Sequence, residues 1–110
     1  MSKRSVNLLL EDILEAIENI QDYTLKNSFE EFMTDQKTKD AVVRNFEIIG
    51  EAASKLPNEF RKDNPQIDWP GVIGFRNILV HDYFGIDYHI VWTIKTKHLP
   101  KLKKEIRSLI

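Results

Sequence analysis

Apolar residues recur at three- and four-residue spacing in four long segments of the chain, which is the pattern of amphipathic helices. These segments run from about Ser5 to Tyr23, from about Asp35 to Leu56, from Trp69 to about Val80, and from Tyr88 to the C-terminus. No segment shows the strict alternation of apolar and polar residues that is typical of a half-buried strand. The pattern therefore predicts an all-α, up-and-down bundle of four main helices with short helical turns between them.

Residues that favour helix ends occur at the expected boundaries. The predicted N-caps are Ser5, Ser28, either Thr34 or Asp35, Asp68, and Asp87. Ser28 and Glu31 also have the spacing of a capping box on a short turn of helix. Residues 57–68 are predicted to be a loop with one helical turn near residues 59–62. Pro100 lacks an amide hydrogen, so it should kink or break the last helix.

Each of the four glycines suggests a local feature of the backbone. Gly50 lies inside a predicted helix, where it costs about 1 kcal/mol relative to alanine, so we expect another backbone to approach closely there. Gly71 and Gly74 are expected to pack tightly against a neighbouring helix or chain. Gly85 should take the left-handed conformation in the turn before the last helix.

The length of 110 residues fits one domain, covering residues 1–110. There is no cysteine, so disulfides and thiolate metal sites are excluded, and we expect a soluble, cytoplasmic protein. No apolar run reaches the roughly 20 residues needed to cross a bilayer, and no signal-peptide core is present. We therefore expect no association with membranes.

The formal net charge is -1, but it is unevenly distributed. Residues 1–55 have a net charge of -4, and residues 56–110 have a net charge of +3. The positive excess is concentrated between Lys95 and Arg107, where Lys101, Lys103 and Lys104 could contact RNA phosphates. The alternative interpretation is a solvated helix face whose basic residues are favoured by the C-terminal helix dipole.

Several kinds of chemistry are excluded by the absence of their motifs. The glycines form neither a dinucleotide-binding fingerprint nor a phosphate-binding loop. No cysteine or suitably placed serine offers a nucleophile for acyl transfer. His89 and His98 lie about 180° apart on a straight helix, so they cannot share a metal. We expect neither a cofactor nor a metal site.

The remaining candidate chemistry lies in residues 76–83. Arg76 is always charged, His81 can gain or lose a proton near neutral pH, and Tyr83 can donate or accept a hydrogen bond. This combination suits a phosphate ester. On one straight helix, however, Arg76 and His81 would lie about 140° apart. They would therefore need a helix that ends near His81, a stretched arginine, or a second subunit, and in isolation the pair could simply cap a helix.

A second group of charged residues, Arg44, Glu47 and Glu51, shares one stripe of the helix that ends near Leu56. Side chains three and four residues apart on a helix can form ion pairs. We expect such intrahelical pairs here, with a role in a functional site as the alternative interpretation.

The ordered set of these features resembles the HepT-like branch of the HEPN superfamily. Arg76-x4-His81-x-Tyr83 is similar to the R-x4-H-x-Y signature of that branch, and Arg44-Asn45-x-Glu47-x-x-Gly50-Glu51-Ala52 is similar to its third-helix pattern. The segments Ile67-x-Trp69, Phe84-Gly85-Ile86-Asp87 and Leu99-Pro100-x-Leu102 follow in the expected order. The resemblance covers nearly the whole chain.

The resemblance implies a HEPN-type helical bundle that forms a homodimer and cleaves RNA, with tRNA as a known target class, without a metal. It implies that Arg76 and His81 are the catalytic pair and that Asn77 assists them. It also implies a toxin of a type VII-like toxin–antitoxin pair, in which a minimal nucleotidyltransferase adenylylates Tyr83 and so silences the toxin. The alternative is a noncatalytic helical dimer that binds this nucleotidyltransferase and serves as its acceptor.

Overall fold

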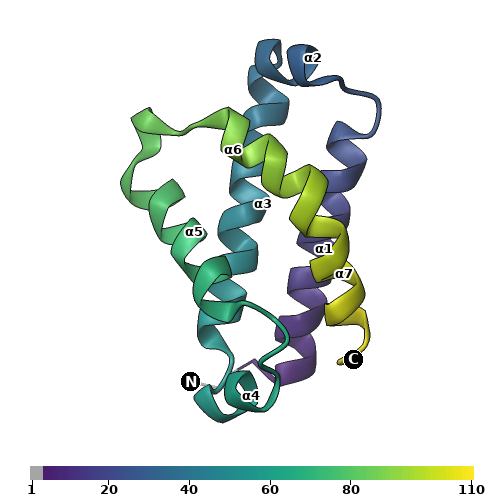
Figure 1. Cartoon of the computed structure of the whole chain (residues 1–110), viewed down its shortest axis with the longest axis vertical. Coiled ribbons are helices and arrows are strands. Elements are labelled where there is room, and N and C mark those ends of the chain that lie inside the picture. The colour runs from purple at the N-terminus through teal and green to yellow at the C-terminus, as the bar shows by residue number, and fades with distance from the viewer. Residues whose placement is uncertain (1–3) are drawn as a thin grey trace.

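The computed structural model describes residues 4–110, and these residues form an all-α bundle (Figure 1). The helices are α1 (Val6–Thr24), α2 (Phe29–Thr34), α3 (Gln36–Lys55), α4 (Asn58–Asp63), α5 (Trp69–His81), α6 (Tyr88–Thr93) and α7 (Leu99–Arg107). A 3-10 turn, η1 (Tyr83–Gly85), follows α5, and a π-helical turn, η2 (Ile94–His98), joins α6 to α7. The predicted fold class is confirmed. None of the helices described, from residue 4 onward, is long and apolar enough to cross a membrane.

The centre of the bundle is the pairing of α1 with α3. α3 also packs against α5, while α7 packs against α1 (Figure 1). Both predicted apolar stripes face this core. The buried members are Leu9, Leu10, Ile13, Ile17 and Ile20 of α1, with Val42, Phe46, Ile49 and Ala53 of α3 and Leu56 just after it. Burial of these side chains provides the main stabilisation of the fold, at roughly 25 cal/mol for each Å² of apolar surface removed from water.

The predicted N-caps are confirmed. The Ser5 hydroxyl accepts a hydrogen bond from the Leu8 amide, and Ser28 and Glu31 form the reciprocal capping box. Of the two candidates for the start of α3, Asp35 is the cap. Asp68 and Asp87 cap α5 and α6 in the same way. These contacts satisfy amide groups that have no partner inside a helix, so they fix where the main helices begin.

The regular α-helix of the last segment is interrupted before Pro100, where a kink or break was predicted. The interruption is the π-helical turn η2, in which the Leu99 amide donates to the Ile94 carbonyl. A proline ring clashes with the carbonyl four residues earlier, and the wider turn relieves that clash. Ile90, an apolar residue of the amphipathic pattern predicted for this segment, is half exposed rather than buried.

The glycine predictions have mixed outcomes. Gly50 does allow close approach, because a Cβ placed there would overlap the Cβ of Arg76 on α5. Gly74 faces open space, so the expected packing against a helix of the same chain is wrong for it, and packing against a second chain stays a prediction. The three atoms nearest to a Cβ at Gly71 all belong to the capping carboxylate of Asp68. Gly85 is not left-handed, because no glycine among residues 4–110 has a positive φ, and a 3-10 turn makes the connection instead.

Candidate functional site

The Arg76–Tyr83 motif spans the C-terminal end of α5, as the sequence predicted. Arg76 and Asn77 lie within the helix, His81 is its last residue, and Tyr83 begins the turn η1. The helix ends because Asp82 leaves the helical conformation, with φ of -121° and ψ of 51°. The motif is therefore held by a rigid helix on one side and by a turn on the other.

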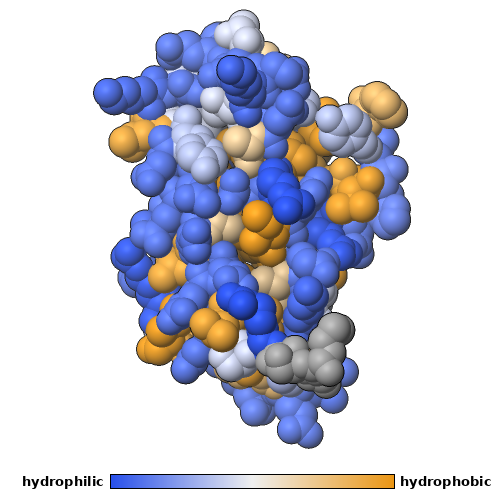
Figure 2. Space-filling model, turned by 180° about the vertical axis from the view of Figure 1, so that it is seen from behind, coloured by the Kyte–Doolittle hydropathy of each residue, from blue (hydrophilic) through white to orange (hydrophobic). Residues whose placement is uncertain are grey.

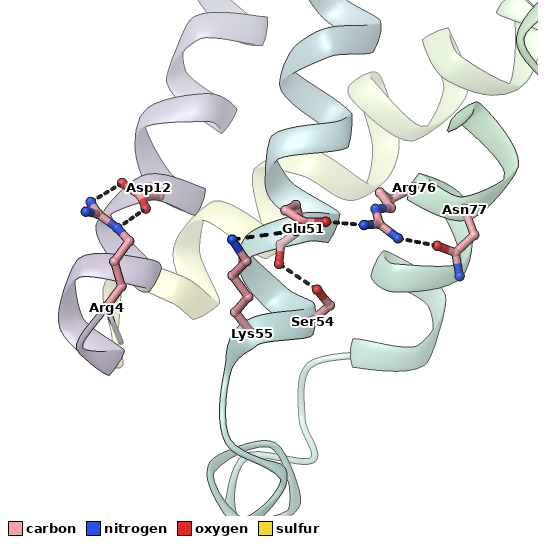
Figure 3. Close-up of polar contacts among 7 residues, drawn as sticks. All are labelled: Arg4, Asp12, Glu51, Ser54, Lys55, Arg76 and Asn77. Atoms are coloured by element: carbon pink, nitrogen blue, oxygen red, sulfur yellow. Dashed lines mark hydrogen bonds and ion pairs between the residues drawn. The ribbon is translucent and has the colours of Figure 1, made fainter. Parts of the chain in front are cut away.

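Arg76 points from α5 toward α3 (Figure 3). Its Nη2 donates to the Glu51 carboxylate, and its Nη1 donates to Asn77 Oδ1 over 2.6 Å. Its side chain is 28% exposed, so these partners hold it at the edge of the bundle rather than inside it. Gly50 supplies the space for the base of the arginine side chain.

Glu51 is the partner of Arg76, a contact that the sequence interpretation did not predict. The hydrogen bond from Arg76 lowers the pKa of the Glu51 carboxyl, and Lys55, with Nζ 3.6 Å from Glu51 Oε1, acts in the same direction. The expected ion pairs among Arg44, Glu47 and Glu51 are wrong, because the described residues contain no such pair and Glu51 instead reaches across to α5. The neighbouring Gly50 was the signal that another helix would come close here.

His81 and Arg76 lie on different sides of α5. The outward side carries Gly74, Asn77, Ile78 and His81 at successive spacings of three, one and three residues, which places them on one helix face. Each is exposed or partly exposed. Within residues 4–110, no hydrogen bond joins His81 to Arg76, Asn77 or Tyr83. One chain therefore joins Arg76 to Asn77 but leaves His81 on another side of α5 from Arg76.

Tyr83 lies on the surface just beyond the helix. Tyr83 is 59% exposed. The centre of its ring lies 5.4 Å from the centre of the Phe84 ring, and the two rings meet edge to face. Phe84 itself is fully exposed. The pKa of the nearby Tyr88 phenol is raised, mainly by burial and further by Asp40 and Tyr83. Tyr83 is thus accessible to another protein, whereas Tyr88 is partly buried.

In the basic segment from Lys95 to Arg107, some side chains contact the rest of the bundle and others are exposed. Lys103 Nζ lies 3.0 Å from Gln21 Oε1, and Arg107 lies 3.7 Å from Glu18, so both side chains attach α7 to α1. The Nζ of Lys95 lies 4.1 Å from the centre of the Trp92 ring. Burial lowers the pKa of the Lys95 ammonium group. Lys101 and Lys104 remain exposed. Their contact with RNA stays a prediction, as does that of Lys103.

A cleft of about 290 Å³ opens beside Arg76. It lies between α1, α3 and α5 on the face shown in Figure 2, where apolar side chains are visible among strongly hydrophilic ones. The lining comprises four cations, three carboxylates and four apolar residues: Arg4, Arg44, Lys55 and Arg76; Asp12, Glu47 and Glu51; and Leu9, Ile48, Ala52 and Val80. Charged groups from three helices therefore meet over an apolar floor. In the part of the chain that the structure describes, no three His, Asp or Glu side chains are grouped as a metal site requires.

Comparison with known proteins decides the family. The family model described as "Ribonuclease HepT-like" matches residues 13–109, which include the whole Arg76–Tyr83 motif. The chain belongs to the HepT-like ribonuclease family. It is 44% identical over 110 residues to "Putative RNase MJ0127" of Methanocaldococcus jannaschii, covering 100% of this chain and 91% of that protein. It is 43% identical over 107 residues to "Probable ribonuclease HepT" of Thermococcus cleftensis, covering 97% of each chain. No solved structure matches the chain significantly.

Proposed function

We propose that this HepT-like chain is a metal-independent endoribonuclease in which Arg76 and His81 carry out the chemistry. The observation that carries the proposal is the complete Arg76-x4-His81-x-Tyr83 motif at an exposed helix end, in a chain of a ribonuclease family. RNA supplies its own nucleophile, the 2'-hydroxyl, so the protein needs to move a proton and to stabilise negative charge on the phosphorus centre.

The two side chains suit these two tasks. His81 is exposed and can take the proton from the 2'-hydroxyl or give one to the leaving oxygen. Such a positioned acid or base contributes a factor of about 10²–10⁴, or about 3–5 kcal/mol of the barrier. Arg76 donates to two protein acceptors, and its guanidinium has further N–H groups for the phosphate oxygens.

A homodimer would place a second copy of the motif beside the first. The outward face of α5, defined by Gly74, Asn77, Ile78 and His81, is exposed or partly exposed. Ile78 is 59% exposed, and the open space beside Gly74 would let a second backbone approach. A second copy packed on this face would bring two His81 residues toward each other, so that one could act as base and the other as acid.

We further propose that the chain is the toxin of a type VII-like pair, with tRNA as its substrate class. A partner nucleotidyltransferase would silence it by adenylylating Tyr83. The exposure of the Tyr83 side chain supports access by such a partner. An added AMP group would place negative charge and bulk in the same motif as Arg76 and His81, and it would therefore repel the phosphate of the substrate.

Replacing the proposed acid–base residue tests the nuclease directly. His81→Ala should lower RNA cleavage by about 10²-fold or more, because no other group is assigned to move the proton. Helix content should not change, since His81 is exposed and makes no hydrogen bond to Arg76, Asn77 or Tyr83. Cleavage is measured on a mixed tRNA pool, and circular dichroism and light scattering serve as controls. Full activity in His81→Ala would exclude the assigned role.

The separation of His81 from Arg76 within one chain favours a second candidate function. In that case the chain would be a noncatalytic dimer that binds the nucleotidyltransferase and presents Tyr83 as an acceptor. Tight complex formation without cleavage of any RNA in a broad pool would support this candidate. Cleavage that depends on His81 would exclude it.

A further inference from the structure

The cleft beside Arg76 combines arginines with an apolar floor. Leu9, Ile48, Ala52 and Val80 form the floor, and the cations Arg4, Arg44, Lys55 and Arg76 line its sides. The volume of about 290 Å³ is at the lower limit of ligand sites in proteins, which span about 300–1,000 Å³. A ligand of this size that combines negative charge with a flat apolar face is a single nucleotide unit.

Arg44 is the cation of this cleft that remains available to a ligand. Arg4 is paired with Asp12 at 2.8 Å, and Lys55 lies 3.6 Å from Glu51. Arg44 is exposed, and over residues 4–110 no ion pair or side-chain hydrogen bond occupies it. Its guanidinium can therefore offer two parallel N–H groups to a phosphate.

Carboxylates in the same cleft limit how nucleic acid could bind there. Glu47 lies one turn from Arg44 on α3 and also lines the cleft, so the surface is not uniformly positive. A diffuse basic patch would bind RNA nonspecifically, whereas this arrangement favours a localised contact with one phosphate. Arg76 lines the same cleft from α5, which connects it to the proposed site of cleavage.

We infer that this cleft binds the nucleotide adjoining the cleaved phosphate. Arg44 contacts the neighbouring phosphate of a single-stranded segment, and the base or ribose of that nucleotide lies on the floor formed by Ile48, Ala52 and Val80. This inference rests on the proposed function, because it takes Arg76 as the group at the cleaved phosphate. It places the RNA across the α1–α3–α5 face rather than along α7, where Lys103 is already held by Gln21 and lies near Glu18.

RNA affinity across a salt series tests this placement. The protein used is the full chain with His81→Ala, so that the RNA stays intact, and the probe is a short single-stranded RNA of mixed sequence. Loss of one phosphate contact lowers the steepness of log affinity against log salt by about 0.7 for a single strand. Arg44→Gln should therefore reduce the slope by about this amount and weaken binding at low salt.

Two further variants identify the surface that binds the RNA. Lys37→Gln removes the same charge from an exposed position in the first turn of α3, outside the cleft, and should leave the slope unchanged. Lys104→Gln tests the rival surface on α7. An unchanged slope in Arg44→Gln, or a slope that changes only in Lys104→Gln, would overturn the inference, and so would the absence of measurable binding before Arg44 is changed.

The salt series and the cleavage assay test the inferred subsite and the proposed nuclease separately. If the unsubstituted chain cleaves RNA but Arg44→Gln leaves the salt slope unchanged, the inferred subsite is wrong and the nuclease assignment remains. If Arg44→Gln flattens the slope but the unsubstituted chain cleaves no RNA, the binding subsite remains and the nuclease assignment is wrong.

Discussion

At the scale of single residues, Arg76 and Tyr83 occupy contrasting environments. Arg76 is held by Glu51 and Asn77 and is about one-quarter exposed, whereas Tyr83 is more than half exposed and contacts only Phe84 among the aromatic rings near it. A held arginine can stabilise charge without first becoming ordered. An exposed phenol can be modified without unfolding the bundle. The two residues therefore suit the separate tasks of chemistry and control.

The proposed control role of Tyr83 predicts a specific modification. Coexpression with a minimal nucleotidyltransferase should add AMP to the chain, which intact-mass spectrometry detects as a discrete increase. Tyr83→Phe should abolish that increase because the acceptor hydroxyl is gone. Tyr23 is 46% exposed and provides the matched control, since Tyr23→Phe should leave the modification in place. An increase that persists in Tyr83→Phe would show that the acceptor lies elsewhere.

Residue roles that depend on local spacing were predictable from the sequence, and those that depend on contacts between helices were not. The caps Ser5, Ser28 and Asp68 satisfy amides only a few residues away, so their pattern is visible in the chain. Glu51 and Arg76 are 25 residues apart, and only the packing of two helices brings them together. A sequence pattern fixes neither the crossing point nor the direction of a long side chain.

At the scale of secondary-structure elements, the close contact of α3 with α5 positions Arg76. Gly50 lies where the two helices meet, and a Cβ there would overlap the Cβ of Arg76 and lie 3.2 Å from the Val72 carbonyl oxygen. A Cβ has a fixed position relative to its backbone, so neither the side chain added at residue 50 nor that of Arg76 could relieve this overlap by rotating. The absence of a side chain at residue 50 therefore determines how near Arg76 comes to Glu51.

Gly50→Ala should destabilise the protein although alanine is the better helix former. Alanine gains about 1 kcal/mol in helix propensity, but forcing the helices apart costs about 1–3 kcal/mol, and we expect a net loss of up to about 2 kcal/mol. Urea unfolding measures this change. RNA cleavage should fall as well, because Arg76 moves with α5.

Gly74→Ala is the matched control for this substitution. A Cβ at residue 74 meets no atom within 4 Å, so alanine there should stabilise the helix by about 0.4–1 kcal/mol. Comparing both variants in an Ile78→Glu background removes any contribution from a second subunit. Equal effects of the two substitutions would show that contact between α3 and α5 does not decide the outcome.

Two features of the elements could not be read from the sequence. Pro100 predicted a bend, but whether the chain would break, kink or form a π-helical turn depends on how α6 and α7 pack against the bundle. Gly74 is a residue type that is common where two helices pack closely, yet no atom of the chain lies within 4 Å of a Cβ placed there. The sequence indicates that a glycine permits close approach and does not say which partner approaches.

At the scale of the whole molecule, the bundle leaves an apolar surface beside its candidate site. Ile78 and Phe84 are 59% and 100% exposed, and they lie in or shortly after the last turn of α5. Covering such a surface removes apolar area from water and is favourable, and clustered exposed apolar residues commonly mark an interface. The proposed homodimer covers them and brings two motifs together.

Ile78→Glu should therefore give a folded monomer with little ribonuclease activity. The added carboxylates would face each other across a two-fold interface, where like charges and lost apolar contact both oppose association. Sedimentation velocity measures the mass, and circular dichroism measures the helix content. Leu25 is 77% exposed at the far end of α1, and Leu25→Glu should remain a dimer. A dimer of unchanged stability in Ile78→Glu would place the interface elsewhere.

The chemical structure of the RNA ends tests the central claim most directly. Incubation of the purified chain with tRNA in excess EDTA should give products that end in 2',3'-cyclic phosphate and begin with a 5'-hydroxyl, as mass spectrometry can establish. These ends are expected because the 2'-hydroxyl is the nucleophile and no metal-bound water takes part. The loss of cleavage in EDTA, or products with 3'-hydroxyl and 5'-phosphate ends, would contradict the mechanism assigned to Arg76 and His81.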